Sequence, residues 1–283
     1  MEAKINAFGS YLNDVKKMSK NTQESYKRDL NKMRIFLENE GVTGVEEITR
    51  ARIDSYIQYL ENNHFAATTV SRTMAAIKTW FHFLKEQYGI DEEPVKRLKP
   101  PKISKKLPEI LSVEDTRKLL SQPTGNRPKD LRDKAMLLVL YETGMRASQL
   151  ISLQITDVDF DKNIIICRDE TRTREIAVEE HVIKMIREYL LLARGSMVEK
   201  TKSESLFVNC SGKDMSRQGL WKILKGYAKK AGIEMDITPH TLRHSFAVHC
   251  FQKGMCMKDI QQLLGNADIS SMQVYIDICK KCD

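Results

Sequence analysis

One tyrosine and three basic residues in the second half of the sequence have the side chains for catalysis. Arg146 follows Gly144, which ends one predicted helix just before the next begins, so the guanidinium can point into a cleft. His240 and Arg243 are three residues apart at the start of a predicted helix and therefore share one face. Tyr275 adds a phenolic hydroxyl near the C-terminus. Taken singly, these residues also fit ordinary roles: a surface charge, a helix cap and a core aromatic.

Several motifs of hydrolases and metal sites are absent from the sequence. It holds no Gly-rich Walker loop, no G-x-S-x-G and no H-E-x-x-H. Cys279 and Cys282 form its one C-x-x-C, and without a second pair this is a weak metal signal. The sequence therefore predicts a reaction that uses no metal and no cofactor.

Composition argues against two further classes of protein. No window approaches eighteen uninterrupted apolar residues and the N-terminus lacks a secretory pattern, so neither a membrane span nor secretion is expected. Six cysteines in 283 residues are too sparse for a disulfide scaffold. We expect a cytoplasmic protein whose 41% apolar residues suffice for the cores of two domains.

The net charge of +8 is concentrated in one segment. Residues 1–93 carry a net charge of −1 and residues 109–283 one of +3, whereas residues 94–108 carry +6. Four of the seven prolines also lie in 94–108, so neither a helix nor a central strand can run through it. We predict a semi-extended linker that contacts a polyanion through six basic residues: Lys96, Arg97, Lys99, Lys102, Lys105 and Lys106.

Hydrophobic periodicity predicts a mainly helical, α+β protein with a domain on each side of this linker. For the first domain, 1–93, helical spacing predicts four helices, over 5–17, 22–40, 50–63 and 67–88. For the second domain, 109–283, alternation predicts a small antiparallel sheet of three strands, over 158–160, 164–168 and 175–178. The rest of the second domain is predicted to be helical, with helices at 112–115 onward, 130–142, 147 onward, 180–194, 217–231, 240–253, 257–264 and 270–278.

Five short motifs, in their order and separations, resemble those of the tyrosine recombinases. The resemblance is strongest to the Xer type and its relatives, the phage-type integrases of mobile elements, and it covers about residues 5–278. It rests on TGMRASQL (143–150), SRQGLWKILK (216–225), TPHTLRHSFA (238–247), LLGNADIS (263–270) and QVY (273–275). The resemblance implies a SAM-like, four-helix core-binding domain before the linker and a mixed helical catalytic domain after it.

The resemblance also implies a reaction. Tyr275 matches the nucleophile that forms a 3′-phosphotyrosyl link, which conserves the bond energy for religation. Arg146 and Arg243 match the arginines that hold the non-bridging phosphate oxygens, and His240 matches a histidine that assists proton transfer. The implied activity is site-specific cutting and rejoining of double-stranded DNA through a Holliday junction, by a homotetramer or by an assembly with a related recombinase.

Three positions depart from the family pattern. Gln149 stands where the family has a carboxylate, and an amide cannot offset the charge of Arg146. Asn266 stands where the family has histidine or tryptophan; its amide can still donate to phosphate, so it stays in the catalytic set. The turn 168–174 holds no lysine to act as the leaving-group acid. Arg172, or else Arg168, can stabilise charge there, although a guanidinium is a poor general acid.

Further DNA contacts are predicted outside the catalytic set. The resemblance makes Arg217 and Gln218 contacts of the catalytic domain. In the first domain, hydroxyl groups and Arg72 near the start of the last helix can meet phosphates. Trp221 is predicted to pack in the core.

Two alternatives to a recombinase stay open at this point. A type IB topoisomerase uses the same tyrosine chemistry, and relaxation of supercoils without a specific site would favour it. A recombinase-fold DNA-binding protein with decayed catalysis would account for Gln149, Asn266 and the missing lysine. Specific binding without a covalent adduct would favour that second alternative.

Overall fold

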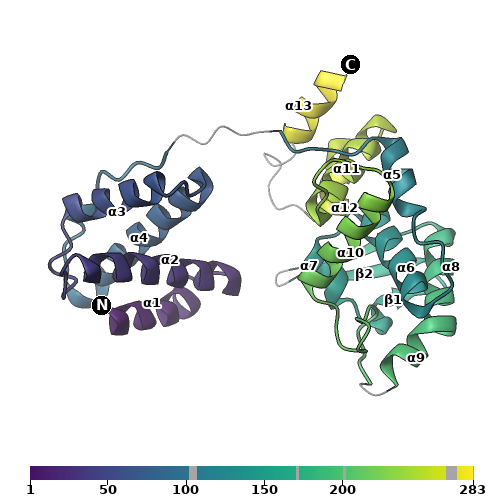
Figure 1. The fold of residues 1–283 in the computed structure, drawn as a ribbon, viewed down its shortest axis with the longest axis horizontal. Coiled ribbons are helices and arrows are strands. Elements are labelled where there is room, and N and C mark those ends of the chain that lie inside the picture. Colours follow the sequence, from purple (N-terminus) through teal and green to yellow (C-terminus); the bar gives the residue numbers. More distant parts are fainter. Residues whose placement is uncertain (102–106, 170–171, 200–201, 266–272, 283) are drawn as a thin grey trace. The chain divides into compact units, whose positions relative to one another are not determined.

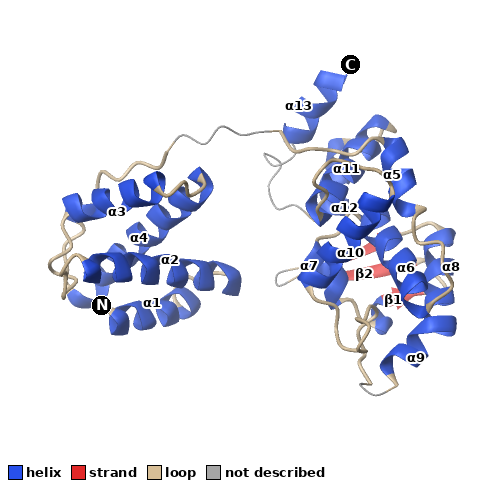
Figure 2. Cartoon of the chain, in the orientation of Figure 1, coloured by secondary structure: helices blue, strands red, loops and turns tan. Residues whose placement is uncertain are grey.

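The computed structural model describes residues 1–101, 107–169, 172–199, 202–265 and 273–282 (Figures 1 and 2). The chain divides into two compact units, Met1–Lys105 and Lys106–Asp283. Helices dominate both units, and the described strands all lie in the second (Figure 2). No described helix is both long enough and apolar enough to cross a bilayer.

The N-terminal unit is a four-helix domain, as predicted. Ser19 and Thr49 begin the second and third helices, because each hydroxyl accepts a backbone N–H from the first turn. The fourth helix buries three aromatic side chains, those of Phe81, Phe83 and the fully buried Trp80. The helices are α1 (Glu2–Asp14), α2 (Lys20–Asn39), α3 (Arg50–Asn62) and α4 (Ala67–Tyr88).

The N-terminal core extends into the segment predicted as a linker. A short 3-10 turn, η1 (Glu93–Val95), follows α4, and Val95 and Leu98 are buried in the core of this unit. The packed part therefore reaches beyond the predicted boundary at residue 93, because two apolar side chains anchor the proline-rich segment. The cations that alternate with these two residues are exposed: Lys96, Arg97 and Lys99.

The C-terminal unit contains the predicted three-stranded antiparallel sheet, with the strand order β1 (Val158–Asp159), β2 (Ile164–Arg168), β3 (Thr173–Ala177). Its register pairs Ile165 with Ile176, both buried, and Cys167 with Arg174. Because residues two apart on a strand share one face, Arg174 lies on the same inward face as Ile176.

Helices surround this sheet and form most of the second unit (Figure 1). The helix predicted over 180–194 changes at Leu190 into a π-helical turn, η3 (Leu190–Arg194). Helix α11 packs against α6, α12 and α13. The helices and the remaining turn are α5 (Val113–Leu120), α6 (Pro128–Thr143), α7 (Ala147–Ser152), η2 (Ile155–Asp157), α8 (Glu180–Tyr189), α9 (Gly195–Val198), α10 (Arg217–Lys230), α11 (Pro239–Gln252), α12 (Met257–Leu264) and α13 (Gln273–Cys282).

A buried ion pair within α6 is hydrogen-bonded to α10 through Tyr227. Arg132 donates from Nε and Nη2 to Asp133 Oδ1 at 2.9 and 2.6 Å, and from Nη1 to the Val208 carbonyl at 3.0 Å. The Tyr227 hydroxyl donates to Asp133 Oδ2 at 3.0 Å. Both charges are buried, so each depends on these partners in place of water.

The substitution Asp133→Ala should destabilise the C-terminal unit by about 3–5 kcal/mol, because it leaves the Arg132 guanidinium buried without a counter-charge. Urea unfolding of the full chain, monitored through the unfolding transition of the C-terminal unit, measures the decrease in its free energy of unfolding. Glu114→Ala is the control: it breaks an exposed pair with Lys118 and should barely move the midpoint. Equal effects of the two substitutions on the urea midpoint would contradict the stabilising role of Asp133.

Candidate active site

The turn between α6 and α7 positions Arg146. Gly144 ends α6 in the left-handed region, with φ of 56°, and a Cβ there would overlap the Phe246 ring. Only glycine fits such a position. Arg146 lies just before the first turn of α7, and its backbone N–H donates to Gln149 Oε1 at 2.8 Å. This bond satisfies a backbone donor at the helix start and fixes where the arginine side chain begins.

Arg243, on α11, is 5% exposed. Its Nη1 donates to the Gly144 carbonyl at 2.6 Å and its Nη2 to the Leu264 carbonyl at 2.8 Å. Burial and then the nearby charge of Arg146 lower the pKa of Arg243 to about 10, which leaves it protonated at neutral pH. The side chain thus holds the end of α6 and the end of α12 against α11.

His240 lies in the first turn of α11, which Thr238 caps by accepting the Thr241 N–H at 3.1 Å. Its ring centroid is 6.4 Å from that of His244, one turn later on the same face. Desolvation and then the charges of Arg243 and Arg146 lower the pKa of His240 below its usual value. The imidazole is therefore mainly neutral at pH 7.

Tyr275, on α13, is 3% exposed, and its hydroxyl is 2.9 Å from His244 Nδ1. Burial raises the pKa of Tyr275, while the charges of Arg243 and Arg146 oppose the rise. Burial, followed by His240 and Arg243, lowers the pKa of His244 to about 4. A neutral imidazole therefore faces the tyrosine hydroxyl, within reach of the charges of two arginines.

The turn after β2 places a carboxylate beside Arg146. Asp169 Oδ2 is 3.1 Å from Arg146 Nη1 and 3.2 Å from Gln149 Nε2. The Asp169 backbone N–H donates to the Arg172 carbonyl at 2.8 Å, which closes this end of the hairpin. Asp169 thus supplies the site with a negative charge, which the neutral Gln149 does not.

Arg174, on β3, contributes a third guanidinium. Its Nη2 donates to Gln149 Oε1 at 3.4 Å, and a Cβ at Gly265 would overlap the guanidinium. Its Nε is buried and has no hydrogen-bond partner among the described residues. Burial lowers the pKa of Arg174, and the charge of Arg146 lowers it further. The group therefore lies close to the other two arginines.

Three guanidinium groups thus lie close together, and among the described residues Asp169 supplies a carboxylate that is hydrogen-bonded to one of them, that of Arg146. Like charges raise each other's free energy, so an anion that bonds to all three would be strongly stabilised. Among the described residues, no three His, Cys, Asp or Glu side chains gather where they could hold a metal ion. Guanidinium groups gathered in this way favour an anionic ligand such as a phosphate, close to the phenolic hydroxyl of Tyr275.

The structure brings together four of the six predicted catalytic residues: Arg146, His240, Arg243 and Tyr275. Arg172 is exposed at the turn, and in the described part of the chain its guanidinium makes no hydrogen bond or ion pair. The other arginine considered there, Arg168, forms an ion pair with Asp157. Asn266 lies outside the described residues, as do Lys102, Lys105 and Lys106.

Sequence reasoning missed three residues of the site, although two of them had a local signal. His244 is one helical turn beyond His240, so it shares that face. Arg174 is two residues before an apolar strand position, Ile176, so it points inward. Asp169 lies in the turn that reaches Arg146, but nothing near it in the sequence indicates that contact.

The predicted DNA contacts outside the site differ in their surroundings. Arg217 and Gln218 are exposed in the first turn of α10, after the cap residue Ser216. The prediction that Trp221 packs in the core is wrong: the residue is 40% exposed, and Lys225 Nζ lies 4.2 Å from its ring centroid. It faces outward because α10 buries Leu220, Leu224, Tyr227 and Ala228 instead.

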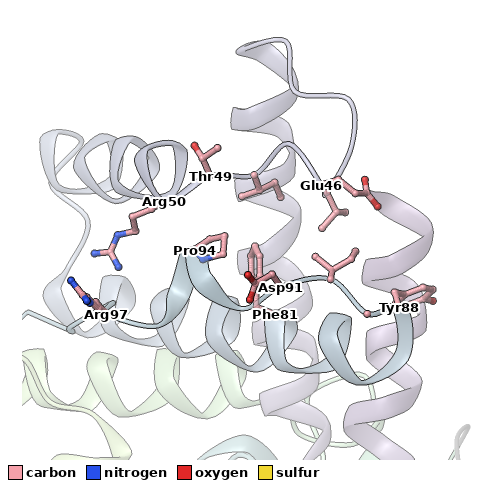
Figure 3. A pocket seen from close by; sticks show the side chains of 12 residues that line it. Glu46, Thr49, Arg50, Phe81, Tyr88, Asp91, Pro94 and Arg97 are labelled. Carbon is pink, nitrogen blue, oxygen red and sulfur yellow. The ribbon is translucent and has the colours of Figure 1, made fainter.

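Arg72 is held by an ion pair inside the N-terminal unit. Its Nε and Nη2 donate to the buried Asp29 carboxylate at 2.8 and 3.1 Å, which ties α4 to α2. Arg97 lines a hollow of about 970 Å³ together with Arg50 (Figure 3). None of the candidate catalytic residues lines this hollow.

Both units of the chain resemble known proteins. Residues 109–281 match the model of the phage integrase family, and residues 5–88 match the N-terminal SAM-like domain of phage integrases. The tyrosine recombinase XerC of Herpetosiphon aurantiacus is 36% identical over 280 residues, which are 98% of this chain and 91% of the relative. The tyrosine recombinase XerD of Halalkalibacterium halodurans is 38% identical over 265 residues, 93% and 89% of the two chains.

Solved structures show the same fold. The XerA recombinase is 28% identical, with a TM-score of 0.55 over 96% of this chain and 92% of that one. The XerH site-specific recombinase, bound to palindromic difH substrate in a post-cleavage complex, is 19% identical, with a TM-score of 0.79 over 99% and 82%. With two family models covering most of its length and relatives above 35% identity along nearly all of it, this chain belongs to the phage integrase family of tyrosine recombinases.

Proposed function

We propose that this chain is a site-specific DNA recombinase that cuts and rejoins strands through Tyr275. The observation that carries the proposal is the Tyr275 hydroxyl, bonded to a neutral histidine beside converging arginines. The guanidinium groups of Arg146 and Arg243 match the charge and fork geometry of the non-bridging phosphate oxygens. A phosphodiester bound there would lie next to a phenolic nucleophile.

In the proposed step, the Tyr275 oxygen forms a bond to phosphorus while the bond to the 5′ oxygen of the next nucleotide breaks. The hydroxyl proton passes to His244 Nδ1, the departing 5′ oxygen takes up a proton from water with the assistance of His240, and His244 then returns its proton to water, so no net proton is consumed. Arg172 is the sequence-predicted residue that would offset charge on the reacting groups, and Asn266 is the one that would donate a hydrogen bond to the phosphate. The phosphotyrosyl bond conserves the energy of the broken bond, and religation reverses the step.

The proposed partner is double-stranded DNA with a specific recombination site, held by a homotetramer that exchanges strands through a Holliday junction. Solved family members support a DNA partner: XerH is bound to difH substrate, and a lambda integrase dimer to a COC′ core site. Arg217, Gln218, Arg72 and the basic linker residues are the proposed contacts outside the active site. We place the activity in the cytoplasm, on nucleoid or mobile-element DNA.

Tyr275→Phe should abolish the covalent protein–DNA adduct while leaving DNA binding intact, because it removes only the nucleophilic oxygen. A nicked substrate that traps the 3′ link, analysed on a denaturing gel, measures the adduct. Tyr141→Phe is a matched control, since the Tyr141 hydroxyl also meets a histidine nitrogen, His249 Nδ1 at 2.8 Å. Adducts that persist in Tyr275→Phe would overturn the assignment of Tyr275 as the nucleophile. Parent protein that binds DNA specifically but forms no adduct would favour the alternative of a DNA-binding protein with decayed catalysis.

His244→Phe should slow adduct formation by about 100-fold, because it keeps the ring volume but removes the acceptor of the tyrosine proton. The low pKa of His244, about 4, keeps the imidazole neutral at and above pH 5, so its contribution should be level there. The contribution is lost only as the pH falls toward 4. Parent and variant rates on the nicked substrate across this range test the assignment, which fails if their ratio changes near the ordinary histidine pKa.

Replacing the six basic linker residues with glutamine should weaken DNA binding and flatten its salt dependence, by a slope of about 0.9 for each phosphate that the linker no longer neutralises. Binding isotherms at several salt concentrations measure the slope. A variant with each linker lysine changed to arginine and Arg97 changed to lysine keeps the charge and should keep the slope. An unchanged slope in the glutamine variant would contradict the proposed linker contacts.

A further inference from the structure

Gln149 and Asp169 form a polar pair that holds two parts of Arg146. Gln149 Oε1 accepts the backbone N–H of Arg146, and Gln149 Nε2 donates to Asp169 Oδ2. The same Asp169 oxygen accepts from Arg146 Nη1. The amide therefore fixes the backbone of the arginine, and the carboxylate fixes its guanidinium.

The position of Asp169 is set by the sheet. It directly follows β2, whose last residues, Cys167 and Arg168, are paired with Arg174 and Thr173. Its own N–H bonds to the Arg172 carbonyl across the turn. The hairpin, fixed at this end, therefore places the Asp169 carboxylate beside Arg146, which lies 23 positions earlier in the chain.

A negative charge is needed at this place for two physical reasons. The Arg146 side chain is 36% exposed, so without a partner its guanidinium would sample several rotamers before a phosphate arrives. Arg146 also repels Arg243 and Arg174, as their lowered pKa values indicate. Gln149, being neutral, can orient but cannot offset charge, whereas a carboxylate does both.

We propose that Asp169 is a positioning residue that acts through Arg146, and that the Gln149–Asp169 pair requires one carboxylate and one amide in either order. The proposal rests on the proposed function, in which Arg146 holds the phosphate. It predicts that exchanging the two side-chain types between the positions preserves the site, since an asparagine amide at 169 would donate to a glutamate at 149.

The test is a double-mutant cycle of Asp169→Asn, Gln149→Glu and the combination of both, read as adduct formation on the nicked substrate. Asp169→Asn removes the charge-assisted bond and should slow the reaction by about tenfold or more. Gln149→Glu should also slow it, because two carboxylates would then lie within hydrogen-bond distance of each other. The double substitution should recover most of the lost rate.

Two further measurements separate positioning from simple folding. Asp169→Asn should bind the DNA at least as tightly as the parent, because it removes a negative charge near the phosphate, whereas a misfolded site would bind more weakly. Asp159→Asn is the matched control: that carboxylate accepts two backbone N–H groups in the other turn of the sheet, and its loss should leave the adduct rate unchanged.

The inference would be overturned if the double substitution raised the activation free energy of adduct formation by as much as the two single substitutions together, or more. It would also be overturned if the Asp169→Asn variant kept the parent rate. Either result leaves the proposed function standing, provided that the parent forms an adduct that Tyr275→Phe abolishes. Absence of that adduct in the parent would instead overturn the proposed function. The two failures are therefore distinguishable in one assay.

Discussion

The buried guanidinium of Arg243 is the interaction on which the candidate active site depends. A charge inside a protein is stable only when hydrogen-bond partners replace the water that it has lost. Arg243 finds two of them in the carbonyls of Gly144 and Leu264, at the ends of α6 and α12, where carbonyls lack partners within their own helices. One side chain of α11 therefore binds the ends of two other helices.

The other charges of the site follow from those two helix ends. Arg146 is two residues beyond Gly144, and the next residue after Leu264 is Gly265, against which Arg174 lies. The arrangement brings three like charges together, which costs stability in the absence of an anion. Asp169 offsets part of that cost, and in the proposed function the substrate phosphate offsets the rest. The same excess of positive charge would therefore favour both binding of the phosphate and stabilisation of its transition state.

Local patterns in the sequence predict much of the fold and the core of the site. The four N-terminal helices and the three strands follow from the spacing of apolar residues, which depends only on neighbours along the chain. The group of Arg146, His240, Arg243 and Tyr275 lies within short motifs. Trp221 is mispredicted because tryptophan is usually buried, although the helical phase of the buried leucines in α10 already indicated an outward position.

By itself the sequence determines the elements and the residue types at their ends; only the tertiary structure decides which of them become partners. Arg243 and Gly144 are 99 positions apart, His244 and Tyr275 are 31 apart, and Arg146 and Asp169 are 23 apart. No short-range rule constrains such pairs, because their free energy comes from burial and charge that exist only once the elements pack. Hence glutamine at position 149 indicates a missing charge in the sequence, whereas the folded chain supplies that charge from a turn of the sheet.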